Sequence, residues 1–389
     1  MRGTIPPSCA DLLRAMVGFD TVNGHISGRA GAERELSCYL EEQARAMGFE
    51  TARLPVDDSG FNLLVTYGGG ADRPWILFES HLDTVSVADM TVEPFAGEVR
   101  DGRLYGRGAC DTKGSGAAML WALRCYAECD EHPNNVAIVY TLDEEIGKSG
   151  IRSFVAGLGS VGFRPRGAVV GEPTELRPVV AHNGVVRWAI RTKGVAAHSA
   201  DPSKGRSAIR MMCGVMGAIE SRYIPALTAS HPLTGKAQCS INVIRGGTQI
   251  NIIPESCEIR VDRRVVPGED VAGVTPALMR LLGELRREDS ELLVDVETLM
   301  VDWPLDPAAG QDFIRRVKGA LGELGLAPEP CGAGYATDAS DFARAGIPAV
   351  VLGPGSIGQA HTHDEWLALA QLQRAVDVYL GVMRSVSEG

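Results

Sequence analysis

Two hydrophobic periodicities alternate along the first third of the chain. Residues 32–49 and 113–130 repeat apolar side chains at helical spacing. After each of these helices, short and largely apolar runs predict strands buried on both faces, at residues 61–70, 75–80, 135–142 and 167–173. Buried strands that alternate with helices predict an α/β domain, with a mostly parallel sheet and helices on both faces.

The pattern changes at about residue 181. Strand-like alternation over residues 180–194 is followed by a predicted helix, two strands, a helix and a strand, at residues 205–223, 238–247, 255–266, 271–288 and 291–300. This βαββαβ order predicts a small ferredoxin-like α+β unit. The first pattern then resumes, and its last helix is expected from about Trp366. We therefore predict one domain of residues 1–180 and 302–389, with residues 181–301 inserted into it.

Composition narrows the class of protein. The chain has 389 residues, enough for two domains, and its net charge of −11 disfavours binding to nucleic acid or to anionic membranes. The N-terminal residues lack the pattern of a signal peptide, and no apolar run approaches the length of a membrane span. Nine cysteines without a CxxC pair favour small buried hydrophobes in a reducing compartment. We therefore expect a cytoplasmic protein.

Imidazole and carboxylate side chains follow the predicted strands where each strand ends. Asp111 follows a predicted hairpin at residues 98–108, which has Asp101 and Gly102 in its turn. The complete set is His81, Asp83, Asp111, Glu144, Glu145, Glu172, His361 and His363. Because sites in parallel sheets form at the carboxyl ends of the strands, we expect these side chains to meet. Such a set is typical of a zinc, cobalt or manganese site.

Each of these residues alone has a plainer interpretation. His81 could be a buried structural histidine, Asp111 could cap the next helix, and Glu172 could be a turn residue. Glu144 and Glu145 could favour the positive end of a helix dipole. It is their common position at one sheet edge that favours a metal site.

Glu144 and Glu145 are expected to have different roles, because neighbouring side chains of a strand point to opposite faces. Two metal ions about 3.5 Å apart need a bridging carboxylate and further ligands on each side. Two histidines and three carboxylates are enough ligands for two metal ions. One member of the pair Glu144 and Glu145 is then not needed as a ligand. We interpret one glutamate as a ligand and the other as the base that takes a proton from water. Asp83 fits a partner that fixes the tautomer of His81.

Five motifs occur in order along the chain: HLDTV, GRGACDTKG, DEEIG, GEPT and QAHTHDE. Their order and spacing resemble the co-catalytic zinc amidohydrolases, the family of acetylornithine deacetylase, succinyl-diaminopimelate desuccinylase, aminoacylase and carboxypeptidase G. The resemblance implies two divalent metal ions, zinc or else cobalt or manganese. The implied ligands are His81, Asp111 and Glu172 for one ion and Asp111, Glu145 and His361 for the other. Asp111 would bridge the two ions.

The same resemblance assigns further features near these ligands. Glu144 matches the general base, and His361 rather than His363 matches the ligand that precedes Asp-Glu. The peptide bond between Asp111 and Thr112 is implied to be cis.

The insertion resembles the lid and dimerisation domain of this family, which implies a homodimer. His198, in GVAAHSA, would reach the active site of the partner subunit, although alone it could be a surface-loop histidine. Asn242 and Arg264 would contact the substrate. Arg264 could bind an α-carboxylate through two hydrogen bonds, or it could be an exposed strand residue. Ala336 stands where the family often has glycine.

The segment VLGPGSIGQAHTHDEW is most similar to acetylornithine deacetylases. This similarity implies an N-acyl amino acid as substrate, such as N-acetyl-ornithine in arginine synthesis. The alternatives are succinyl-diaminopimelate desuccinylation, an aminoacylase or dipeptidase activity, or an inactive metal-binding protein that serves in interactions. The complete set of ligands and base argues against the inactive protein.

Overall fold

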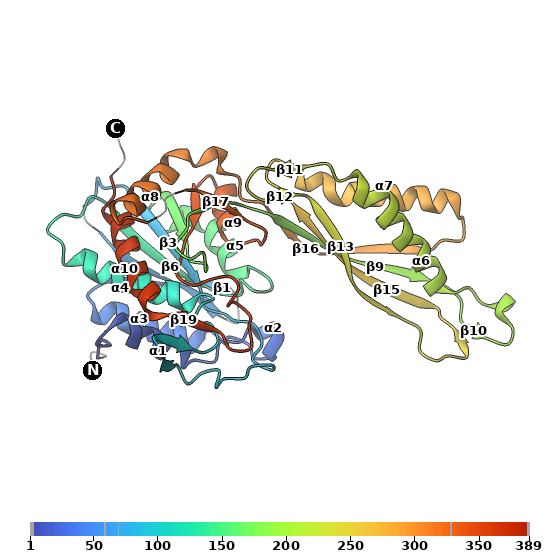
Figure 1. Cartoon of the computed structure of the whole chain (residues 1–389), viewed down its shortest axis with the longest axis horizontal. Coiled ribbons are helices and arrows are strands. Elements are labelled where there is room, and N and C mark those ends of the chain that lie inside the picture. Colours follow the sequence, from blue (N-terminus) through green and yellow to red (C-terminus); the bar gives the residue numbers. More distant parts are fainter. Residues whose placement is uncertain (1–3, 58–59, 69, 327–328, 387–389) are drawn as a thin grey trace. The chain divides into compact units, whose positions relative to one another are not determined.

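The computed structural model describes residues 4–57, 60–68, 70–326 and 329–386. The chain divides into two compact units (Figure 1). They comprise Met1–Val180, Pro307–Cys331 and Thr337–Gly389 in the first, and Ala181–Asp306 and Gly332–Ala336 in the second. Each unit has its own hydrophobic core.

An eight-stranded sheet runs through the first unit. Its order is β1 (Glu50–Asp57), β2 (Gly60–Tyr67), β6 (Asn135–Thr141), β3 (Trp75–His81), β7 (Pro165–Val170), β18 (Ala349–Val351), β8 (Val179–His182) and β17 (Cys331–Ala333). The central strands β6, β3, β7 and β18 are parallel, which confirms the predicted sheet. The sequence pattern did not predict β1, because this antiparallel edge strand is half exposed and has no apolar run.

Helices pack on both faces of this sheet. They are α1 (Cys9–Val17), α3 (Arg34–Ala46), α4 (Lys113–Ala127), α5 (Ser149–Ala156), α8 (Gln311–Glu323), α9 (Ala339–Arg344) and α10 (Leu369–Arg384). The single turn α2 (Gly24–Ser27) has no buried residue. Ile76 and Phe78 share one core with α1, α3, α4, α8 and α10, whereas Leu77 is buried outside that core. Figure 1 shows α4 and α10 side by side. Phe154 of α5 and Phe342 of α9 pack edge to face outside the same core.

A small three-stranded sheet contains the predicted hairpin, and α4 follows this hairpin in the chain. Strands β4 (Glu98–Arg100) and β5 (Arg103–Tyr105) form the predicted hairpin, and Asp101 and Gly102 have positive φ angles, as a type I′ turn requires. Strand β19 (Trp366–Ala368) pairs with β5. The predicted start of the last helix at about Trp366 is therefore wrong, since these residues form a strand and α10 begins three residues later.

The second unit has the predicted βαββαβ order. Its antiparallel sheet has the order β13 (Gln238–Gly246), β15 (Ser256–Val265), β9 (Gly184–Lys193) and β16 (Val294–Asp302). Two helices, α6 (Ala208–Ala218) and α7 (Val271–Glu288), pack on it around the buried Trp188. Two short strand pairs complete the unit, β10 (Ala197–His198) with β14 (Ile252–Ile253) and β11 (Ser230–His231) with β12 (Gly235–Lys236).

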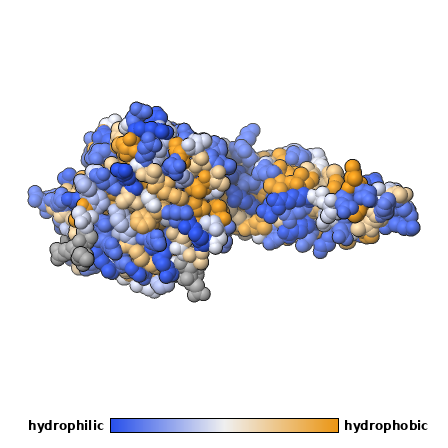
Figure 2. Space-filling model, turned by 90° about the horizontal axis from the view of Figure 1, so that it is seen from below, coloured by the Kyte–Doolittle hydropathy of each residue, from blue (hydrophilic) through white to orange (hydrophobic). Residues whose placement is uncertain are grey.

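The face of the chain seen in Figure 2 is mostly polar, with scattered apolar residues. Within the described ranges, none of the helices combines the length and the apolar character that a bilayer crossing requires.

Candidate metal centre

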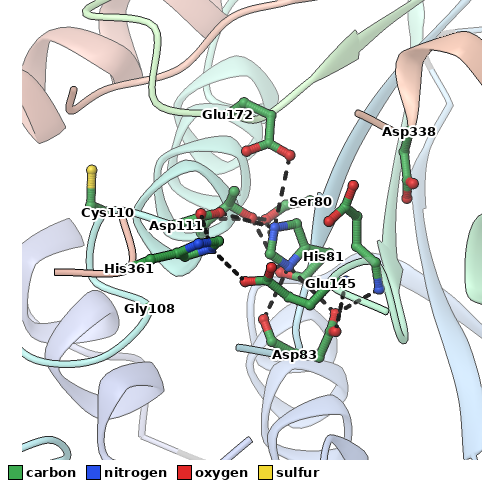
Figure 3. A network of polar contacts seen from close by, with 12 residues as sticks. Ser80, His81, Asp83, Gly108, Cys110, Asp111, Glu145, Glu172, Asp338 and His361 are labelled. Carbon is green, nitrogen blue, oxygen red and sulfur yellow. Dashed lines mark hydrogen bonds and ion pairs between the residues drawn. The ribbon is translucent and has the colours of Figure 1, made fainter. Parts of the chain in front are cut away.

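The carboxyl ends of β3, β6 and β7 bring predicted residues to one edge of the sheet (Figure 3). His81 is the last residue of β3, Glu145 follows β6, and Glu172 follows β7. Asp111 comes from the loop before α4, and His361 from the loop before β19. Figure 3 shows these five side chains converging. His81, Asp111 and Glu172 are buried, and half of the His361 side chain is exposed.

Asp111 lies between two groups of possible ligands. Its Oδ1 is 3.1 Å from His81 Nε2, and its Oδ2 is 3.2 Å from His361 Nε2. His81 Nε2 is also 3.8 Å from Glu172 Oε1, and His361 Nε2 is 3.2 Å from Glu145 Oε1. The structure thus brings together two triads of side chains that share Asp111, and each carboxylate oxygen of Asp111 faces one triad.

The chemistry of these residues fits divalent cations. Burial raises the pKa of Glu145 to about 7 and raises the pKa of Glu172 well above its usual range. Hydrogen bonds with Asp111 and Glu145 raise the pKa of His361 to about 10. Without metal, a protonated imidazole therefore lies among the carboxylates. Divalent cations could replace such protons, because nitrogen and carboxylate donors suit zinc and similar metals.

Asp83 connects His81 to residues 142–150, which carry Glu144 and Glu145 and are called the glutamate segment below. Its backbone oxygen accepts a hydrogen bond from His81 Nδ1 at 3.0 Å, which leaves Nε2 as the nitrogen directed at Asp111. Its carboxylate is 3.4 Å from the same Nδ1 and accepts hydrogen bonds from the backbone N–H groups of Glu144 and Glu145, at 2.9 and 3.1 Å. Asp83 therefore orients His81 and both glutamates.

The two adjacent glutamates have different neighbours. Glu145 contacts His361, whereas Glu144 Oε1 is 3.4 Å from Nζ of the buried Lys148, which is 3.6 Å from Asp338 Oδ1. Glu144 also lies close enough to His81 and Glu172 to complete a possible ligand group with them. Sequence reasoning missed Lys148 and Asp338, because only the fold brings the start of α9 beside the start of α5.

Glu365 is a third residue that sequence reasoning missed. It is fully buried, and its Oε1 accepts hydrogen bonds from the backbone N–H groups of Cys110 and Asp111, at 2.9 and 3.0 Å. Its Oε2 is 2.8 Å from Arg107 Nη1. These partners lie in the motifs GRGACD and HTHDE, but the motifs alone do not indicate that they contact each other. The peptide bond between Asp111 and Thr112, next to the N–H groups that Glu365 binds, is cis, as the resemblance implies.

Comparison with known proteins decides the family. The model of peptidase family M20/M25/M40 matches residues 77–385. This chain belongs to that family. It is therefore a metal-dependent hydrolase that acts on amide bonds.

Known proteins resemble this M20 hydrolase over nearly its whole length. An acetylornithine deacetylase from Edwardsiella ictaluri (strain 93-146) is 31% identical over an alignment of 377 residues, and the match covers 93% of each chain. The structure of an M20 family metallo-carboxypeptidase from Sulfolobus solfataricus matches with a TM-score of 0.79 at 16% identity, covering 95% of this chain and 97% of the other. A dinuclear metal binding M20 peptidase from Bacillus subtilis matches with a TM-score of 0.72 at 15% identity, covering 96% of each chain. The M20 fold with its inserted lid domain is thus confirmed.

The three remaining predicted residues of this M20 hydrolase lie in the second unit. His198 is exposed on β10, and its Nδ1 accepts a hydrogen bond from the Ala200 N–H at 3.1 Å. The proton of the neutral ring is therefore on Nε2, which can act as a donor. Asn242 is exposed where the register of β13 and β15 shifts, a position at which bulges redirect side chains. Arg264 Nε donates to Asp262 Oδ1 at 2.7 Å.

We expect replacement of Glu33 by glutamine to stabilise the metal-free protein above neutral pH. Burial and the charge of Asp83 raise the pKa of Glu33 to about 7. The folded chain therefore binds an extra proton between about pH 4.5 and 7, and its stability falls as the pH rises through this range. Glu33→Gln should increase the free energy of unfolding by about 3 kcal/mol at pH 8 and by less than about 1 kcal/mol at pH 5. Urea unfolding at both pH values would measure this, and an equal effect at both would contradict the assignment.

Proposed function

We propose that this M20 hydrolase cleaves the amide bond of an N-acyl amino acid, with two divalent metal ions and Glu144 as general base. The observation that carries the proposal is the pair of triads that share Asp111. Zinc is the first candidate metal because it favours imidazole and carboxylate ligands, and cobalt and manganese are the alternatives. The Bacillus subtilis relative, a dinuclear metal binding peptidase, supports the number of ions.

Each part of the site has a role in this proposal. Two bound cations would polarise the amide carbonyl and make a water molecule more acidic. Glu144 accepts the proton of the attacking water and then gives it to the nitrogen of the leaving amine. Burial raises the pKa of Glu144, and Lys148, 3.4 Å away, opposes this rise by favouring the charged carboxylate. His198 of the partner subunit donates a hydrogen bond to the carbonyl oxygen as negative charge develops there. The products are a carboxylate and a free amine.

N-acetyl-ornithine is the first candidate substrate. The proposal is supported by the acetylornithine deacetylase that is 31% identical over nearly the whole chain, and it would place the enzyme in arginine biosynthesis. N-Succinyl-diaminopimelate is the second candidate, and acyl amino acids or dipeptides are the third. Asn242 and Arg264 would contact the substrate, with the guanidinium of Arg264 on its α-carboxylate. An inactive protein would not need Glu144 beside the triads.

A turnover panel tests this proposal. Zinc-loaded and cobalt-loaded protein would be assayed with N-acetyl-ornithine, N-succinyl-diaminopimelate, N-formyl amino acids and dipeptides. We expect the highest kcat/KM for N-acetyl-ornithine. A higher value for a succinylated substrate or a dipeptide would reassign the substrate, and metal binding without turnover of any amide would favour the interaction protein.

We further propose a cytoplasmic homodimer that pairs through the inserted unit, residues 181–301. A homodimer with two-fold symmetry presents the same surface from both subunits, so that each His198 can serve the other site. The acidic chain, with a net charge of −11, supports a small-molecule substrate rather than nucleic acid or a membrane surface.

A further inference from the structure

Asn23 is distant in sequence from the proposed ligands, but backbone hydrogen bonds hold it next to the segment that contains Asp83. Val22 forms a parallel bridge with Thr84, three residues after the end of β3. The Asn23 N–H donates to the Thr84 oxygen at 2.9 Å, and the Thr84 N–H donates to the Thr21 oxygen at 3.0 Å. Asn23 is 1% exposed. Residues 21–23 therefore run alongside the segment that contains Asp83.

The side-chain amide of Asn23 joins two carboxylates. Its Nδ2 donates to Asp83 Oδ2 at 2.8 Å and to Asp143 Oδ1 at 2.9 Å. Its Oδ1 accepts a hydrogen bond from the His25 N–H at 2.9 Å. An asparagine amide has two N–H donors, so both are engaged. The amide thus separates two negatively charged groups that would otherwise face each other.

Both carboxylates hold the segment that carries the two glutamates. Asp83 accepts hydrogen bonds from the N–H groups of Glu144 and Glu145. Asp143, which has a φ of +60°, accepts a hydrogen bond from the Ser149 hydroxyl at 2.8 Å and so closes the turn around the glutamates. Asn23 is the one described side chain that donates to both carboxylates.

We propose that Asn23 is a positioning residue for the metal centre. It acts through Asp83 and Asp143, because its two hydrogen bonds offset their repulsion and fix the distance between β3 and the glutamate segment. Glu145 is thereby held toward His361, and Glu144 is held beside Lys148. This inference rests on the metal centre of the proposed function.

Removing the two donors should weaken metal binding. Changes in residues that orient metal ligands typically lower metal affinity or activity by about 10–100-fold. We expect Asn23→Ala and the nearly isosteric Asn23→Asp to weaken zinc binding by about this factor. The value of kcat should fall with little change in KM, because the displaced groups act on the reaction rather than on substrate binding.

Asn62 offers a matched control on the same segment. It is fully buried, its Nδ2 donates to the Gly150 oxygen at 2.8 Å, and its Oδ1 accepts from the Leu142 N–H at 3.3 Å. Like Asn23, it anchors residues 142–150, but it contacts neither Asp83 nor the glutamates. Asn62→Ala should lower the thermal stability of the metal-free protein and leave zinc affinity within about twofold of wild type.

The experiment is a zinc titration of metal-free protein against a competing chelator, combined with thermal unfolding of each metal-free variant. The proposal predicts weaker zinc binding in both Asn23 variants and not in Asn62→Ala. Asn23→Asp provides the comparison if the alanine variant does not fold. Wild-type affinity in a folded Asn23 variant, or an equal loss in Asn62→Ala, would overturn the positioning role. Failure of the wild-type protein to bind zinc would instead contradict the proposed function.

Discussion

Replacing Glu144 with alanine is expected to lower kcat by about 10²–10⁴-fold while the protein keeps its metal ions. A general base can be removed without loss of a ligand, and the nearest cation to Glu144 is Lys148 at 3.4 Å. Glu145→Ala should instead lose metal, because the Glu145 carboxylate contacts His361 in one of the triads. Turnover and the metal content after desalting would be measured for both variants.

Glu144→Gln keeps the size of the side chain and serves as the companion variant. It separates loss of the base from any effect of leaving Lys148 buried without its 3.4 Å partner. Equal loss of metal from Glu144→Ala and Glu145→Ala would make Glu144 a ligand, together with His81 and Glu172. Substantial activity in either Glu144 variant would remove it as the base.

Mixed dimers of two inactive variants are expected to recover about a quarter of wild-type activity. His198→Ala and Glu144→Ala subunits would be unfolded together and refolded. If His198 serves the partner's site, one site of each mixed dimer receives both defects and the other receives neither. With equal mixing, half of the dimers are mixed and half of their sites are intact.

His231 provides a matched control for this experiment. Like His198, it lies in a short strand of the second unit, and its Nδ1 accepts a hydrogen bond from the N–H two residues later, at 3.3 Å. His231→Ala should remain active. If subunits are shown to exchange and activity does not recover, His198 acts within its own subunit or not at all.

Local patterns were sufficient to predict the central strands and the residues at their ends. Residues 75–78 and 136–140 are continuously apolar because both faces of those strands are buried, and the fold places His81 at the end of one strand and Glu145 just after the other, as expected. The strand at Trp366 was not predicted, since only its partner, β5, distinguishes it from the start of a helix.

The supporting contacts of the metal centre depend on residues far apart in sequence. Glu365 lies 254 residues after Asp111, and Asn23 lies 60 residues before Asp83. No periodicity relates such pairs, and an isolated asparagine or glutamate carries no signal of its partner. The residues that gather at this edge of the sheet, with Asp83 beside His81, could therefore be predicted, whereas the contacts of Glu365 and Asn23 required the structure.

The number of tightly bound metal ions tests the account most directly. Wild-type protein would be loaded with zinc and desalted, and its zinc content would be measured by elemental analysis. The two triads that meet at Asp111 predict close to two zinc ions per chain. One tightly bound ion and no second ion, even from excess zinc, would contradict the bridging role of Asp111 and the two-metal site.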